Sequence, residues 1–294
     1  MEYIETYADV KKAKPKNARA YLRDVALTLL STYDNITGIE EILKKPRVQF
    51  LILHHIFKDE EAKFAILLEK LALIHTFISY SEAIQRVLSG NIDKPYITFS
   101  FDDGFKNHLK AAEILYNFGA KSCFFINPSV IGETDISKIY THNTSQLHFP
   151  PVQQLTWKDT EIMQKMGHEF GSHTMYHKDV TTQSKAEFED DLNETRRILL
   201  QNCGEAAHFA YPYGRYFHFN KIAFNTVFTC GFTSCASAER GCHISHFEPL
   251  QKDELLVRRD DIVLDWHINH IFYFLTQSAR KATFHNNILP ASYK

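Results

Sequence analysis

The strongest constraint on the fold is a repeated alternation of short apolar segments with amphipathic segments of helical length. The apolar run VQFLILHHI precedes DEEAKFAILLEKLALIHTF, in which apolar residues recur at i, i+3, i+4 and i+7. The pattern continues through YITFSFDDG, HLKAAEILYNFG, AKSCFFINP, HEFGSH, KAEFEDDLNETRRILLQNCG, AHFAYPYG, VFTCGFTS and ELLVRRDDIVLDW. Strands that alternate with helices form parallel sheets. We therefore predict an α/β fold, a distorted (β/α) barrel of about seven parallel strands.

The first residues of the chain do not share this alternation. Residues 1–46 contain helical stretches such as ALTLLSTYDNI but no motif, so we expect an N-terminal helical extension there and the barrel over residues 47–294. Residues 132–154, GETDISKIYTHNTSQLHFPPVQQ, are polar and contain proline. This stretch is predicted to be a long surface loop near the site, with His142 and His148 in solvent.

Charge and apolar segments argue against several functional classes. The chain has 33 Lys+Arg against 35 Asp+Glu and a formal net charge of -2, which argues against a nucleic-acid partner. No apolar signal segment opens the sequence and no run of about 18 apolar residues is present, so we expect no membrane span and a cytoplasmic location. The sequence gives no indication of the oligomeric state.

The five cysteines are an odd, scattered set without a CxxC pair. They fit a reducing compartment and are expected to be buried, inert thiols. A zinc site made by Cys230, Cys235 and Cys242 is the alternative, although their spacing matches no familiar zinc motif.

Two adjacent carboxylates, Asp102 and Asp103, end the apolar run YITFSF. Charge beside an apolar strand is costly unless something pairs with it, so the two acids suggest cation binding. Asp-Asp-Gly is also a common turn sequence, and a simple strand-ending turn is the competing interpretation.

Two histidines four residues apart, His173 and His177, follow the predicted strand HEFGSH. One helical turn would bring both imidazoles to the same side, a spacing suited to metal ligands. With one carboxylate they would form a three-ligand set that leaves a coordination position for water, as catalytic zinc sites require. A chance HxxxH is the competing interpretation.

A third segment, FAYPYG at residues 209–214, is suited to an irregular backbone because proline fixes φ and glycine permits unusual torsions. Such a loop can direct a backbone N–H inward. If the segment stood alone, an ordinary aromatic turn would be the preferred interpretation.

In this order the segments resemble the polysaccharide deacetylase family, also called carbohydrate esterase family four or the nodulation-protein deacetylase homology domain. The resemblance spans about residues 48–265 and rests on TFSFDDGF, KSCFFIN, LTWKDTEIMQKMGHEFGSHTMYH, HFAYPYG and GFTSCASAERG. It implies a (β/α) barrel, a carbohydrate substrate and a divalent metal.

The resemblance also implies roles for single residues. Asp102 corresponds to the general base of the family, and Asp103, His173 and His177 correspond to its metal ligands. Zinc is expected first because two imidazoles and one carboxylate suit it, and cobalt, nickel and iron accept the same ligands.

The proline-tyrosine loop corresponds to one wall of the family's substrate groove. Tyr211, Pro212 and Tyr213 are therefore expected at the substrate, with the N–H of Tyr213 helping to bind the oxyanion.

The sequence departs from the family where an arginine usually orients the base, because Ala210 occupies that place. Arg259 resembles an arginine that some branches supply from a later strand, and it is our candidate, with Arg258 as the near alternative. An ordinary surface pair is the competing interpretation.

The family's C-terminal Leu-x-His, its usual general acid, is also missing, and His285 does not fit it. Branches resembling deacetylases of poly-N-acetylglucosamine supply this histidine from an early strand as Tyr-His-x-Ile. Leu-His-His-Ile at residues 53–56 matches that place, which makes His54 the candidate acid and His55 its neighbour. A hydrogen-bonded core histidine is the alternative.

One family motif is not carried over. Asp261, Asp265 and Trp266 are similar to its Asp-x-x-Asp-Trp segment, but the two acids are separated by one residue too many. We expect Trp266 to serve in packing.

The resemblance thus implies a metal-dependent hydrolase that removes the N-acetyl group from an amino sugar in a polysaccharide or glycan intermediate, releasing acetate. An O-acetyl esterase acting on glycans is one alternative, since the same apparatus serves both acyl groups. A catalytically degenerate glycan-binding protein is the other, suggested by the three departures above.

Overall fold

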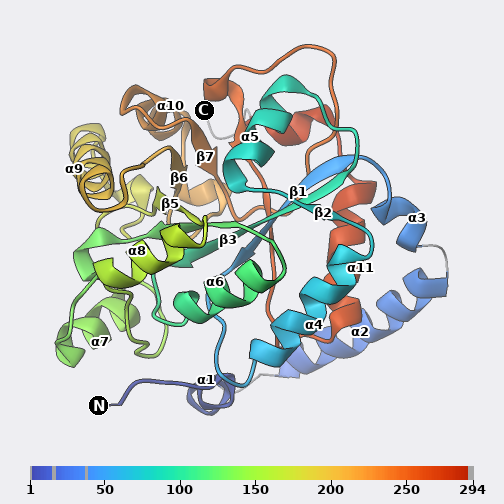
Figure 1. Cartoon of the computed structure of the whole chain (residues 1–294), viewed down its shortest axis with the longest axis horizontal. Coiled ribbons are helices and arrows are strands. Elements are labelled where there is room, and N and C mark those ends of the chain that lie inside the picture. The colour runs from blue at the N-terminus through green and yellow to red at the C-terminus, as the bar shows by residue number, and fades with distance from the viewer. Residues whose placement is uncertain (1, 15–17, 37–38, 291–294) are drawn as a thin grey trace.

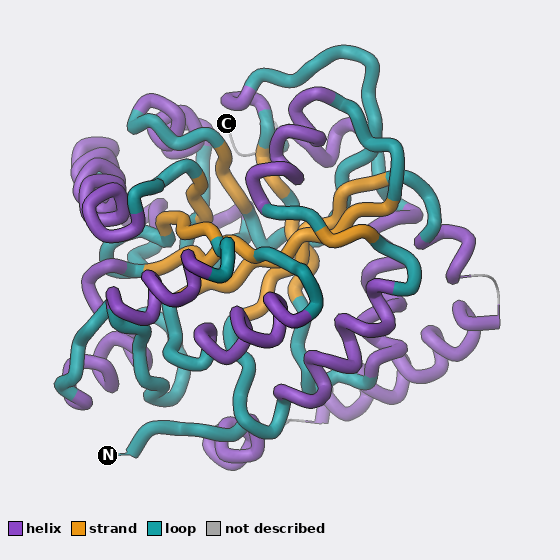
Figure 2. Tube along the Cα trace, in the orientation of Figure 1, coloured by secondary structure: helices purple, strands orange, loops and turns teal. Residues whose placement is uncertain are grey.

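The computed structural model describes residues 2–14, 18–36 and 39–290. Its centre is a parallel sheet in which the strands follow the order β8-β7-β6-β5-β4-β3-β1-β9, with β2 pairing β3 beside this path. Helices surround the curved sheet (Figures 1 and 2). The predicted distorted (β/α) barrel is confirmed, with eight strands along the path where about seven were expected.

The strands of the described residues are β1 Arg47–Leu53, β2 Thr76–Phe77, β3 Pro95–Asp103, β4 Ser122–Ile126, β5 Glu169–Ser172, β6 His208–Ala210, β7 Ser234–Ala236, β8 Leu256–Val257 and β9 Arg259–Asp261. The α-helices are α1 Tyr7–Ala13, α2 Ala18–Ile36, α3 Ile39–Leu43, α4 Glu61–Ala72, α5 Tyr80–Ser89, α6 His108–Asn117, α7 Ile136–Ser145, α8 Trp157–Lys165, α9 Lys185–Cys203, α10 Lys221–Thr229 and α11 Ile268–Arg280.

Alternate residues of β1 pack on the two sides of the sheet, because successive side chains of a strand point to opposite faces. Leu51 and Leu53 belong to the large core cluster shared with α4, α6, α8 and α11. Val48 and Phe50 belong to a second cluster, whose members include residues of β1, β3, β4, β6, β7, β8 and α5. Strands from opposite parts of the sheet thus contribute to one interior core.

Helix α5 contributes a buried aromatic residue to this interior. The Tyr80 ring packs edge-on against Phe50 at 5.1 Å and against Phe125 at 5.4 Å. The interior is therefore filled by side chains, and the remaining space lies at the carboxyl ends of the strands.

Register places the carboxyl ends of three strands side by side. In the β1–β3 pair, Leu53 lies opposite Phe101, and in the β3–β4 pair, Asp103 lies opposite Ile126. On the other side of β1, Ile52 lies opposite Asp261 of β9. The residues that follow β1, β3 and β9 therefore meet at one edge of the sheet.

Three local predictions are wrong. Residues 132–154 contain α7, which begins after Asp135, whose side chain accepts a hydrogen bond from the Ser137 N–H at 2.8 Å. VFTCGFTS forms the end of α10 and a turn before β7, and ELLVRRDDIVLDW forms two short strands that separate at Arg258. Tertiary pairing sets the short lengths of these strands, which local patterns do not show.

The described part of residues 1–46 is helical, and α2 packs along α11 (Figure 1). The division of the chain at residue 46 stays a prediction. Within the described ranges, every helix is too short or too polar to cross a lipid bilayer.

Candidate active site

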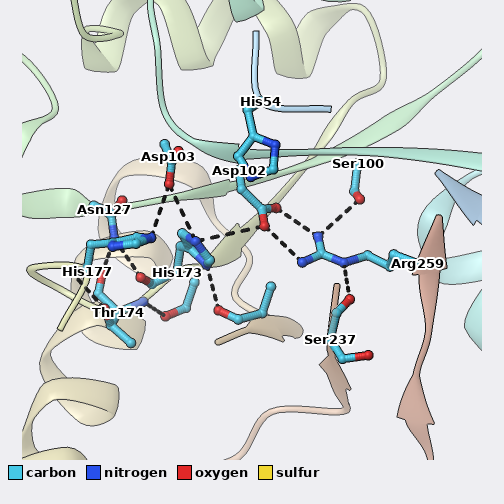
Figure 3. A network of polar contacts seen from close by, with 12 residues as sticks. His54, Ser100, Asp102, Asp103, Asn127, His173, Thr174, His177, Ser237 and Arg259 are labelled. Carbon is cyan, nitrogen blue, oxygen red and sulfur yellow. Dashed lines mark hydrogen bonds and ion pairs between the residues drawn. The ribbon is translucent and has the colours of Figure 1, made fainter. Parts of the chain in front are cut away.

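The two predicted acidic and imidazole motifs come together at the carboxyl edge of the sheet. Asp103 ends β3, and His173 and His177 follow β5, which is separated from β3 only by β4. The Asp103 Oδ1 atom lies 3.5 Å from His173 Nε2 and 3.4 Å from His177 Nε2 (Figure 3). One possible ligand atom from each residue lies within 4.8 Å of the others, and all three residues are buried.

The backbone around the two histidines is irregular, so the predicted helical turn is wrong. Thr174 and His177 both have positive φ, at 65° and 55°, and Asp103 has φ 81°. Such conformations cost about 1–3 kcal/mol each and persist only where neighbours hold them. Here the buried Asn127 amide donates to the carbonyl of His173 at 2.5 Å and to that of Thr174 at 3.0 Å.

The residues present fit a divalent cation. The His173 Nδ1–H donates to the Ala210 carbonyl at 2.7 Å, so Nε2 is the ring nitrogen turned towards the cluster. That nitrogen faces Asp103 Oδ1, a buried oxygen that has no hydrogen-bond donor among the described residues. A divalent cation bound between these atoms would give the buried carboxylate oxygen a partner.

Protonation agrees with this arrangement. Burial lowers the pKa of His177 well below its usual value, and the nearby His173 lowers it further, so its imidazole is neutral. Asp103, His173 and His177 would supply one carboxylate and two imidazoles, which leaves a position for water on zinc.

Asp102 is held by the arginine that the sequence suggested. The Arg259 guanidinium donates from its two terminal nitrogens to the two oxygens of Asp102, both at 2.8 Å. Burial would raise the pKa of Asp102, but Arg259, His173 and His54 together outweigh this effect and lower that pKa to about 2. The carboxylate is therefore ionised and fixed in orientation.

Arg259 is itself fixed by the barrel. Its Nε donates to the Ser237 carbonyl at 2.8 Å, and one terminal nitrogen also donates to Ser100 Oγ at 3.2 Å (Figure 3). The alternative candidate, Arg258, lies 5.6 Å from the centre of the Tyr216 ring instead. Ala210, where the family often has arginine, is buried among the interior residues of the barrel.

His54 follows β1 and faces the same cavity. Its side chain is 44% exposed, and its Nδ1 lies 3.9 Å from Asp261 Oδ1. Its carbonyl accepts a hydrogen bond from Nε2 of the buried His108 at 2.8 Å. His55 points elsewhere, stacked 5.3 Å from the Phe149 ring.

Asp261 is a site residue that the sequence analysis missed. The altered spacing to Asp265 led us to set the whole segment aside, yet Asp261 lies at the cavity. It stands two residues after Arg259 in the same strand, so both side chains point to the same face. The alternation of side chains along β9 is therefore the sequence signal that identifies Asp261.

The other two residues of that segment lie away from the cavity. Trp266 serves in packing, as predicted, and Asp265 pairs with Lys11 at 2.7 Å.

The proline-tyrosine loop divides its residues between core and site. Tyr213 has φ 63°, its ring packs 4.8 Å from His177, and its hydroxyl donates to the Gln146 carbonyl at 2.9 Å. Gly214 is required, because an added Cβ would lie 2.4 Å from that of Ala238. Tyr211 is fully buried and stacked on Phe219, and neither it nor Pro212 lines the cavity.

These side chains enclose a small, open cavity of about 200 Å³. Leu147 after α7 and Arg215 after β6 are lining residues that no sequence motif indicated. The residues around it are Ile52, His54, Asp102, Asp103, Leu147, His173, His177, Tyr213, Gly214, Arg215, Ala238 and Asp261.

Two further predictions concern residues that do not line this cavity. Cys230, Cys235 and Cys242 form no ligand cluster, so the alternative zinc site is wrong. Cys235 and Cys242 are buried thiols as expected, whereas Cys230 is only partly buried. His142 is only half-exposed on α7, where burial lowers its pKa to about 4, whereas His148 is exposed as predicted.

Residues 89–234 match the family model for polysaccharide deacetylases. No curated protein is detectably similar in sequence to the chain. Among solved structures, IcaB from Ammonifex degensii is 18% identical with TM-score 0.61, over 81% of this chain and 98% of its own. The Streptococcus pyogenes deacetylase PplD, determined with acetate, is 17% identical with TM-score 0.63, over 80% and 99%.

A de-N-acetylase from Aggregatibacter actinomycetemcomitans is 16% identical with TM-score 0.60, over 78% of this chain and 99% of its own. At these identities the structural likeness shows a shared fold. The segment that matches the family model contains Asp102, Asp103, His173, His177 and Tyr213. The segment of residues 89–234 therefore belongs to the polysaccharide deacetylase family.

Proposed function

We propose that the protein is a metal-dependent hydrolase that removes the N-acetyl group from an N-acetylated amino sugar of a polysaccharide or glycan intermediate. The observation that carries this proposal is the Asp103, His173 and His177 cluster beside an ionised Asp102 in one open cavity. Family membership supports the reaction class, as do the names of the structural neighbours, which include a de-N-acetylase and a deacetylase with acetate.

The cluster would hold the metal and Asp102 would act as general base. A divalent ion, zinc first and cobalt, nickel or iron as alternatives, would supply Lewis acidity and acidify a water. Asp102 would accept the proton of the attacking water, and Arg259 keeps its two oxygens in a fixed orientation. General-base catalysis of this kind contributes roughly 10²–10⁴-fold.

Tyr213 would stabilise the oxyanion through its backbone. Its hydroxyl is engaged by the Gln146 carbonyl, so the backbone N–H is the group available for the acetyl oxygen. The positive φ of Tyr213 and the close approach of Gly214 to Ala238 fix this turn. Loss of one preorganised donor typically costs about 3 kcal/mol in barrier height.

His54 would donate the proton that the departing amine needs. It lines the cavity together with Asp102, and its Nδ1 lies 3.9 Å from Asp261 Oδ1. A proton donor favours amide over ester cleavage, because an amine is a poor leaving group. The presence of His54 at the cavity is therefore our reason to propose N-deacetylation rather than O-acetyl esterase activity or a binding-only role.

Acetate release from an N-acetylated chitooligosaccharide tests the proposal. We expect Asp102→Asn to keep its metal and lose roughly 10²–10⁴-fold in kcat, because the base is removed while the ligands remain. Asp253→Asn, an exposed acid remote from the cavity lining, is the matched control and should keep normal activity. Normal turnover in Asp102→Asn would remove the assigned base.

A further inference from the structure

The side chain of His54 is held by few contacts of its own. It is 44% exposed, and the nearest opposite charge, Asp261 Oδ1, is 3.9 Å away. An exposed side chain of this kind keeps one place only if the backbone on either side is fixed. The position of the His54–Asp261 pair therefore depends on the loops that follow β1 and β9.

Helix α1 is attached to the loop after β1. The N–H groups of Tyr7 and Ala8 donate to the two carboxylate oxygens of Asp59, at 2.8 and 3.1 Å. The Tyr7 ring also packs 5.7 Å from the ring of His55, the residue next to His54. Glu5 adds an ion pair with Lys58 of the same loop.

The same helix is attached to the loop after β9. The Lys11 ammonium pairs with Asp265 at 2.7 Å, and the side chain of Asp265 is only 10% exposed. Asp265 stands four residues after Asp261. One short helix thus bridges the two loops that carry the two members of the pair.

The flanks of α1 hold a third wall of the cavity. Ile4 N–H donates to the Pro151 carbonyl at 2.9 Å, and Lys14 contacts the carbonyl of His148. These contacts fix the segment after α7, where Leu147 lines the cavity. In Figure 1 the N-terminal segment and α7 lie on the same side of the molecule.

We propose that residues 4–14 are a positioning brace that sets His54 against Asp261 and so controls proton donation to the leaving amine. This inference rests on the proposed function. In the step concerned, the C–N bond breaks, its electron pair goes to nitrogen, and nitrogen takes the proton from the His54 imidazolium. Misplacement of about 1 Å by remote changes can cost roughly 10²-fold in such a step.

A positioning role of residues 4–14 can be distinguished from a merely structural one by comparing amide hydrolysis with aryl-ester hydrolysis. A nitrophenolate leaves without being protonated, so hydrolysis of 4-nitrophenyl acetate needs the base and the oxyanion site but not His54. Disturbing the brace should therefore lower kcat for an N-acetylated chitooligosaccharide and leave the aryl ester unaffected. KM for the oligosaccharide should stay the same, since the sugar contacts are not changed.

The test compares Tyr7→Ala and Lys11→Ala with Lys12→Ala in the full-length protein. Lys12 is the matched control, because its side chain is 79% exposed and pairs with Asp9 of the same helix. We expect the first two variants to lose at least about tenfold in amide kcat, with ester hydrolysis within about twofold of wild type. Lys11→Arg, which can still reach Asp265, should restore the amide rate, and Lys12→Ala should behave as wild type.

Parallel loss of both activities in Tyr7→Ala and Lys11→Ala would show a general structural role and overturn the brace, and so would an unchanged amide rate. A wild-type protein that cleaves the ester but never the amide would instead refute the proposed function, and the brace with it. Thermal unfolding of each variant establishes that it is folded.

Discussion

Two neighbouring residues of β9 carry buried charges to opposite sides of the sheet. Arg259 points into the barrel and pairs with Asp102. Asp260 points outward beneath α11, where it accepts hydrogen bonds from Gln49 at 2.7 Å and from Ser278 at 2.6 Å. Both residues are fully buried, so burial of charge does not by itself distinguish a site from a structural network.

The difference lies in what surrounds each pair. Both oxygens of Asp260 have donors, and Arg240 adds a contact at 3.4 Å. On the inner side, Asp103 Oδ1 has no hydrogen-bond donor among the described residues, and the group opens to a cavity. An unsatisfied acceptor beside an opening, rather than buried charge, distinguishes the candidate site from the hydrogen-bond network of Asp260.

The largest expected effect is at the Arg259–Asp102 ion pair inside the barrel. Arg259→Met leaves the Asp102 carboxylate buried without its partner, which should lower the free energy of unfolding by about 3–5 kcal/mol. Turnover should fall by at least 10²-fold because the base loses its fixed orientation. Urea unfolding and acetate release measure the two effects.

Arg258→Met is the matched control for that variant, since Arg258 packs on Tyr216 and does not contact Asp102. It should change the free energy of unfolding by less than about 1 kcal/mol. Equal effects of the two substitutions would show that the inner pair has no special role.

Changes to the hydrogen-bond network of Asp260 on the outer side of the sheet should affect stability and leave turnover unchanged. Asp260→Asn keeps the shape but weakens the hydrogen bonds to Gln49 and Ser278, at a cost of about 1–3 kcal/mol in the free energy of unfolding. We expect kcat at 25 °C within about twofold of wild type. A loss of turnover without a loss of stability would place Asp260 in the catalytic apparatus and undo the comparison.

The effect expected to be smallest at neutral pH, because it develops only in acid, concerns the pH dependence of stability. Burial lowers the pKa of His168 to about 4, so in the folded protein it binds a proton less readily than in the unfolded chain. Below pH 6.5 the unfolded state therefore takes up the proton first, and stability falls as the pH is lowered towards 4. Each such histidine steepens that fall by up to about 1.4 kcal/mol per pH unit.

His168 lies outside the cavity, where its Nε2–H donates to the Ala112 carbonyl and its Nδ1 accepts from Ser122 N–H. His168→Gln should flatten the dependence of the unfolding free energy on pH between 6.5 and 4, while the pH profile of kcat stays as in wild type. An unchanged slope in chemical unfolding would contradict the assignment of a buried, neutral imidazole.

Much of the site could be predicted because its residues follow strands in recognisable motifs. Asp102, Asp103, His173 and His177 were identified by their resemblance to family motifs, and the meeting of parallel strands at their carboxyl ends agrees with their clustering. Asp261 was missed although the alternation from Arg259 identifies its face. The spacing between Asp261 and Asp265 differs from that of the family motif, and this difference was given more weight than the geometry of the strand.

Other features depend on tertiary structure and leave no local signal. The pairing of β9 with β1, which brings Arg259 to Asp102, joins segments about two hundred residues apart. Leu147 reaches the cavity because α7 and the N-terminal segment hold its loop. The core position of Tyr211 likewise follows from its stacking on Phe219, which the motif does not reveal.

The central claim is that Asp103, His173 and His177 bind one divalent ion. Zinc content per chain, measured after chelation and reconstitution, tests it most directly with His173→Ala beside the exposed His285→Ala as control. The account predicts one zinc per chain in wild type and in His285→Ala, and loss of that zinc in His173→Ala. Zinc retained at the wild-type level in His173→Ala would contradict it.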